Sequence, residues 1–198
     1  SSRLHAIGPA LLGAALLGAA LLGGCVAPPA AAPPGDRLPP GESNPAPVVA
    51  WEVATTGCGA SASMPAPVRE ERTQEGPTLA RVAWSRDADR SRYEIACFDL
   101  PEPLGPEEHD ALLARIERLI RLRPGARAER RRTRVAGLPA VELDVTLPGH
   151  EVGRYWLFLA NDQRLFEVSV VGPAGERLTA GTAVFFGSFR LTAGDQNR

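Results

Sequence analysis

The C-terminal half of this chain alternates apolar and polar residues with a period of two, and this pattern strongly constrains the fold. In 141–147 the odd positions are apolar and the even positions are polar, and 164–171 repeats the pattern with Glu167 and Ser169 on its polar side. Because successive side chains of a strand point to opposite faces, each segment predicts a strand with one buried face. Further strands are predicted at Pro77–Arg86, Ser91–Leu100 and Gly153–Ala160.

The connection between two of these strands is short and polar. Asn161-Asp162-Gln163 separates 153–160 from 164–171. Asn and Asp tolerate the left-handed backbone that tight turns require, so this tripeptide predicts a hairpin turn. Strands joined by such turns form an antiparallel sheet.

Two helices are predicted beside the sheet. Pro106–Arg123 has apolar residues at helical spacing, acidic residues in its first turn and arginines in its last, and Pro124-Gly125 stops it. A second helix is predicted from Pro173 to about Phe186, although its glycines weaken it. Two helices and about six antiparallel strands predict an α+β fold, a sandwich in which helices pack on the sheet.

The N-terminal segment has the features of an export signal. An uncharged, Leu- and Ala-rich stretch ends in Gly23-Gly24 and is followed by Cys25, which resembles the lipobox of bacterial lipoproteins. That resemblance implies removal of residues 1–24, a diacylglycerol on the Cys25 sulfur and an acyl chain such as palmitate on the new N-terminus. Val26 after the cysteine favours the outer membrane, facing the periplasm. The alternative is an uncleaved membrane anchor, since the stretch is long enough to span a bilayer.

A linker and one domain are predicted after Cys25. Residues 25–47 hold the lipidated cysteine and a tract rich in proline and alanine, which cannot bury a core and is expected to be disordered. The folded domain is predicted at 48–191, followed by a C-terminal tail at 192–198. The remaining length suffices for one domain and hardly for two.

The charge balance argues against a nucleic-acid partner. The chain has 22 basic and 23 acidic residues and a formal net charge of −1, so it has no global field that attracts polyanions. The one basic concentration is Arg127–Arg134, RAERRRTR. Two interpretations of it stay open, a local anion-binding patch and a strand whose polar side chains face water.

The residues do not form a recognisable catalytic or metal-binding motif. His109 and His150 are expected at the surface, and zinc requires three or four ligands at suitable spacing. Gly57-Cys58-Gly59-Ala60-Ser61 lacks the spacing of a nucleophile elbow. The sequence singles out no carboxylate pair for acid–base chemistry. We therefore expect a protein that is not an enzyme and holds no metal or cofactor.

Cys58 and Cys97 are the candidates for a disulfide. An exported chain folds where disulfides persist, and the two residues lack the spacing of a metal or redox motif. A structural bridge is favoured, and the alternative is two buried free thiols that behave as small apolar side chains.

Several short motifs are spread in order over Val53 to Leu191. They are Met64-Pro65, Val68–Glu71, Tyr93–Asp99, Val135–Glu142, Arg154-Tyr155, Arg164–Phe166 and Phe185–Leu191. Their order resembles the PsbP-like family. That resemblance implies an α/β/α sandwich, a function in binding partners, and no shared catalytic residues. The family includes a photosystem accessory protein, a nuclear import factor and many bacterial lipoproteins.

These observations predict a membrane-anchored lipoprotein of the bacterial cell envelope that docks an envelope protein partner without catalysis. An alternative is a carrier of a lipid or another apolar ligand held between sheet and helix. A weaker alternative is a hydrolase with an unrecognised site.

Overall fold

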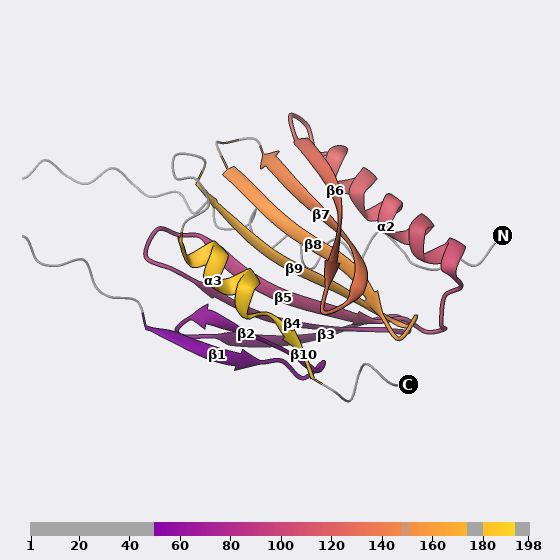
Figure 1. Ribbon diagram of the computed structural model, residues 1–198, viewed down its shortest axis with the longest axis horizontal. Coiled ribbons are helices and arrows are strands. Elements are labelled where there is room, and N and C mark those ends of the chain that lie inside the picture. Colours follow the sequence, from indigo (N-terminus) through magenta and orange to yellow (C-terminus); the bar gives the residue numbers. More distant parts are fainter. Residues whose placement is uncertain (1–49, 148, 150, 174–179, 193–198) are drawn as a thin grey trace, which may run out of the picture.

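The computed structural model is an α+β structure, which confirms the predicted fold class (Figure 1). It describes residues 50–147, 149, 151–173 and 180–192. The strands are β1 (Trp51–Thr55), β2 (Ala60–Pro65), β3 (Arg69–Glu75), β4 (Thr78–Arg86), β5 (Arg92–Asp99), β6 (Arg127–Val135), β7 (Leu138–Leu147), β8 (Glu151–Ala160), β9 (Arg164–Pro173) and β10 (Arg190–Leu191). The helices are α2 (Pro106–Arg121) and α3 (Ala180–Ser188).

The strands form two antiparallel sheets. The large sheet has seven strands in the order β3-β4-β5-β9-β8-β7-β6, and the small sheet has three in the order β1-β2-β10. Because β9 and β8 lie between β5 and β7, the chain must cross over after β5, and α2 lies in this crossover. The crossover leaves β6 at one edge of the large sheet and β3 at the other.

Both faces of the large sheet are covered (Figure 1). On one, which we call the α2 face, the buried side of α2 packs on apolar residues of β5, β7, β8 and β9. On the other, the α3 face, α3 and the small sheet cover a second core that includes Tyr93, Phe158 and Phe166. With two covered faces the molecule has three layers, the arrangement that buries both sides of a sheet.

Helix α2 forms where its sequence predicts it. Pro106 occupies the first turn, and the Gly105 backbone N–H donates to Glu108 Oε2 at 2.9 Å, which satisfies one free donor of the helix start. Its buried side chains follow the predicted stripe: Leu112, Leu113, Ile116 and Ile120. The helix ends at Arg121, two residues before the predicted end, a difference typical of frayed helix ends.

The predicted start of the second helix is wrong. Pro173 ends β9, where it lies opposite Glu151, and α3 begins at Ala180; residues 174–179 lie outside the described part. The strand alternation continues past the predicted end because Gly172 lets β9 pass close to Ser91, where any Cβ would clash. α3 then extends two residues beyond the predicted end, and Phe185 and Phe186 are buried on the sheet.

Two tight turns fix the pairing of β8 with β9 and of β6 with β7. The predicted turn at Asn161-Asp162 is confirmed: both residues have left-handed φ values, 53° and 54°. Ala136 and Gly137, with φ values of 50° and 84°, connect β6 to β7 in the same way. Positive φ at both central residues is the geometry of a type I′ hairpin turn, which matches the twist of the flanking strands.

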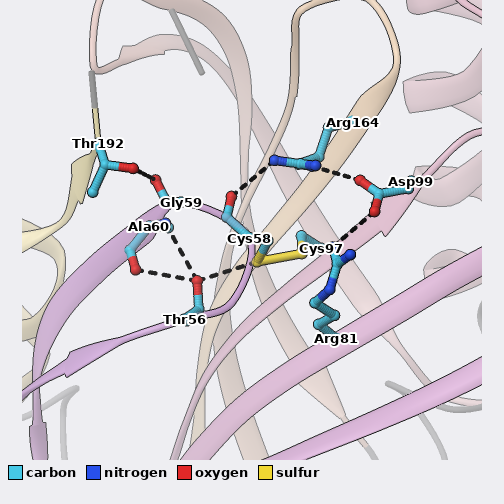
Figure 2. Close-up of a disulfide and its surroundings, with 9 residues drawn as sticks. All are labelled: Thr56, Cys58, Gly59, Ala60, Arg81, Cys97, Asp99, Arg164 and Thr192. Atoms are coloured by element: carbon cyan, nitrogen blue, oxygen red, sulfur yellow. Dashed lines mark hydrogen bonds and ion pairs between the residues drawn. A yellow bond between two sulfur atoms is a disulfide. The ribbon is translucent and has the colours of Figure 1, made fainter. Parts of the chain in front are cut away.

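A disulfide joins the small sheet to the centre of the large one, which confirms the favoured interpretation of Cys58 and Cys97 (Figure 2). Cys58 lies in the turn between β1 and β2, Cys97 lies on β5, and their Cα atoms are 6.5 Å apart. Arg164 extends this connection, because its guanidinium donates to the Cys58 carbonyl at 3.1 Å and to Asp99 Oδ1 at 2.6 Å.

Candidate functional site

An open groove of about 290 Å³ lies between α2 and the edge strand β6. Helix α2 contributes Asp110 and Leu113, β6 contributes three arginines, and the start of β7 forms the floor with residues 139–141. Helix and strand run side by side here (Figure 1). The groove therefore has one basic wall that follows an exposed sheet edge.

The basic wall results from strand alternation within Arg127–Arg134. Arg132 pairs with Val141 and Arg130 with Leu143, both of which pack in the core under α2, so these arginines lie on the α2 face. Arg131 points to the other face, where it forms ion pairs with Glu142, at 2.8 Å, and with Asp144. The strand thus divides its basic residues between two faces.

The three groove arginines differ in their partners. Arg130 Nε lies 3.2 Å from Glu117 Oε2 of α2, and Arg134 Nη1 donates to the Gly137 carbonyl at 2.8 Å. Arg132, between them, is exposed and has no hydrogen-bond or ion-pair partner among the residues that the structure describes. The guanidinium groups of Arg130 and Arg134 are therefore held in place. The guanidinium of Arg132, between them, is available to bind a ligand.

The structure bears on both interpretations of Arg127–Arg134. The segment is a strand, β6, as one of them predicts. The anion-binding interpretation stays a prediction, and the groove gives it a specific location at Arg132. Sequence reasoning indicated the segment but not which of its two faces lies on the α2 side, since the register depends on the Ala136-Gly137 turn.

A second group of arginines surrounds Trp84 on the α2 face near the opposite edge of the sheet. The guanidinium carbons of Arg92, Arg69 and Arg86 lie 4.5, 5.2 and 6.0 Å from the ring centroid. Arg92 is also paired with Glu94 at 2.6 Å. At these distances each arginine attracts the face of the indole ring, so the group stabilises the sheet edge itself.

Two buried carboxyl groups, Glu94 on β5 and Glu167 on β9, lie beside this group. Ala96 is the register partner of Glu167, so the two glutamates are diagonal neighbours on one face, and each is only 3% exposed. Burial and, to a lesser extent, the nearby Glu94 raise the pKa of Glu167 to about 8, against the lowering effect of Arg123 and Arg92. Burial also raises the pKa of Glu94, although Arg92 opposes this.

Sequence reasoning missed this pair. The alternation in 164–171 placed Glu167 and Ser169 on a polar side, but α2 covers that side and both residues are buried. Glu94 stands between apolar neighbours in Tyr93–Asp99, which is the signal that could have indicated its burial. Tyr155 shares the site, and burial raises its pKa as well.

Comparison with known proteins gives no family for this chain. No family model and no curated protein matches it. A crystal structure from Bacteroides thetaiotaomicron VPI-5482 is similar with a TM-score of 0.42 and 12% sequence identity. The match covers 69% of this chain and 46% of that one, so the chain spans less than half the length of that protein. A likeness this distant supports no argument about function.

The histidines and Cys25 are the other residues that the sequence analysis considered. His109 of α2 lies 3.1 Å from the Leu104 carbonyl and 3.3 Å from Asp162 Oδ1. His150 and Cys25 lie outside the described residues. Within the described ranges, His, Cys, Asp and Glu side chains form no group of three or more suited to a metal ion, and no helix is long and apolar enough to cross a bilayer.

Proposed function

We propose that this chain is a lipid-anchored docking module of the bacterial cell envelope, and that it binds an acidic partner in the groove between α2 and β6. The observation that carries the proposal is Arg132, an unpaired guanidinium held between two fixed ones in an open groove. In this proposal the lipid anchor and the linker hold that surface away from the membrane.

The chemistry of the groove favours a carboxylate partner. Guanidinium is planar and permanently charged, and its N–H groups match the two oxygens of a carboxylate. Residues two apart on a strand are separated by about 7 Å, so the three arginines present a row of positive charge at that repeat. Asp110 and Glu117 lie beside the row, and they would repel an acidic partner that approached from the helix side.

The anchor and fold family complete the proposal. A lipidated Cys25 and a Pro-rich linker would hold the domain up to about 70 Å from the membrane, at roughly 3.1 Å per residue. A helix on each face of the large sheet supports assignment to the PsbP-like fold. The resemblance of this chain to that family implies partner binding. We infer an outer-membrane location facing the periplasm from Val26.

Charge reversal at Arg132 tests the docking surface. With a fluorescent oligoglutamate peptide as probe, we expect Arg132→Glu to weaken binding about tenfold or more, because a charge-assisted contact becomes a repulsion. Binding to the unmodified protein should weaken steeply as salt rises, since exposed charges are screened. Fluorescence anisotropy at two salt concentrations measures both effects.

The matched control is Arg118→Glu, which makes the same change in net charge at an exposed position of α2 that does not line the groove. It should bind the probe nearly as well as the unmodified protein. Equal weakening by the two variants would contradict a specific site and indicate attraction by overall charge alone.

Replacing the lipidation residue tests the anchor separately. We expect Cys25→Ser to abolish incorporation of labelled palmitate, because the variant lacks the sulfur that carries the lipid. In the unmodified protein the acyl chains supply the membrane affinity. Labelling of the variant equal to that of the unmodified protein would contradict the anchor and leave the groove hypothesis unaffected.

A further inference from the structure

The free edge of β6 gives the proposed partner a defined conformation. Among the described strands β6 pairs with β7 alone, so one side of its nine-residue backbone has no strand beside it. Resting on the proposed function, we infer that the acidic partner binds as an extended segment that adds an eighth strand to the large sheet beside β6. This mode uses main-chain hydrogen bonds for affinity and alternate side chains for specificity.

The turn at Ala136-Gly137 determines which backbone groups face outward. In a two-residue hairpin the flanking residues, here Val135 and Leu138, exchange both of their backbone hydrogen bonds. Because such pairs alternate along an antiparallel ladder, the next outward-facing N–H and C=O groups belong to Arg134, Arg132 and Arg130. Pro139 is consistent with this register, since it lies opposite Arg134, where β6 needs no donor from β7.

The same three residues therefore supply both parts of the recognition. Their backbone groups point along the free edge, and their side chains lie on the α2 face beside the groove. In an added antiparallel strand, side chains directly opposite them would have Cβ atoms about 4.5–5.5 Å away. The segment that fits has an acidic residue at every second position, in register with Arg130, Arg132 and Arg134.

The charge pattern also selects against a second copy of this chain. Pairing β6 with β6 would place arginines on the same face of adjacent strands, and like charges opposed across strands destabilise a sheet. Charged residues on an edge strand are a common means of preventing such self-association. The arginines of β6 therefore disfavour pairing with β6 of a second copy and favour pairing with an acidic strand.

Two peptides of identical composition test the inference on the folded domain. One alternates glutamate with threonine, and the other carries the same residues with all glutamates contiguous. We expect the alternating peptide to bind about tenfold more tightly. We also expect it to slow amide hydrogen exchange at Arg130, Arg132 and Arg134, with exchange in α2 unchanged. Binding of both peptides with no slowing at these amides would overturn strand addition while leaving an acidic docking site intact. Failure of every acidic peptide to bind would overturn both.

A pair of substitutions at one position separates backbone from charge. Arg132→Ala removes the guanidinium, and Arg132→Pro removes the guanidinium together with the outward N–H, which takes no part in pairing with β7. If the partner adds as a strand, the proline variant should bind the alternating peptide about tenfold more weakly than the alanine variant. Equal binding by two variants that both retain the native circular dichroism spectrum would contradict the inference.

Discussion

Replacing Glu167 by glutamine is expected to stabilise the protein by several kcal/mol at alkaline pH and to have little effect near pH 5. Burial raises the pKa of Glu167 from its ordinary value of 4.5 to about 8, so the folded protein holds a proton there that the unfolded chain releases above pH 4.5. Stability falls with pH wherever the folded state binds more protons than the unfolded state. The contribution of Glu167 is therefore fully present below pH 4.5 and is lost as pH rises through about 8.

The expected size follows from the same pKa. The pKa of Glu167 is 4.5 in the unfolded chain and about 8 in the folded protein. At about 1.4 kcal/mol per pH unit, this difference lowers the unfolding free energy by about 5 kcal/mol at alkaline pH. Glutamine keeps the shape of the protonated carboxyl and cannot ionise, so the variant lacks this loss. Glu94, Arg123 and Arg92 also act on Glu167. In the same site Glu151 acts on Tyr155, and Glu71 acts on Glu94.

Denaturant unfolding from pH 5 to pH 9 measures the effect. The difference in unfolding free energy between Glu167→Gln and the unmodified protein should grow with pH and level off above about pH 8. The control is Glu70→Gln on β3, an exposed carboxylate whose replacement should leave the pH profile parallel to that of the unmodified protein. A parallel profile for Glu167→Gln would show that Glu167 is ionised in the folded state at neutral pH.

Removing the disulfide is expected to lower the unfolding free energy by about 4 kcal/mol. On the chain-entropy model, opening a loop of this length restores that much conformational freedom to the unfolded chain. The double variant Cys58→Ala with Cys97→Ala avoids leaving either partner of the bridge as an unpaired thiol. Since both cysteines are almost completely buried, the lost sulfur contacts would add to the cost.

Reductant provides the matched measurement. It should lower the denaturation midpoint of the unmodified protein toward that of the double variant and leave the variant unchanged. The dependence of stability on denaturant should also become steeper without the bridge, because the unfolded chain is then less compact. Two reactive thiols per unfolded, non-reduced molecule at these positions would contradict the bridge outright.

The sequence was sufficient for β7, β9 and α2 because their signals are local. Period-two alternation located β7 and β9, and the apolar stripe between Pro106 and Pro124 located α2 within two residues. The small sheet had no comparable signal. β2 reads Ala-Ser-Ala-Ser-Met-Pro, and its alanines are buried because the large sheet and α3 lie over them.

The candidate site was predictable in position but not in geometry. The run of arginines in Arg127–Arg134 is visible in the sequence, yet which of them face α2 depends on a turn whose register no local pattern specifies. The burial of Glu167, in contrast, was not predictable from the sequence. Its place in the alternation predicts a solvated side chain, and only the tertiary position of α2 buries it.

If the domain is tethered at its N-terminal end, as we propose, the position of Cys58 has a mechanical consequence. A pulling force applied at residue 50 would reach β1 first, and it could peel β1 from β2 by breaking the ladder between Trp51 and Thr55. Beyond Cys58 the load would pass through a covalent bond to β5, inside the large sheet. Extension of the domain under load would then be confined to the short segment before Cys58. The proposed docking edge at β6, which lies beyond β9, β8 and β7 in the large sheet, would keep its shape.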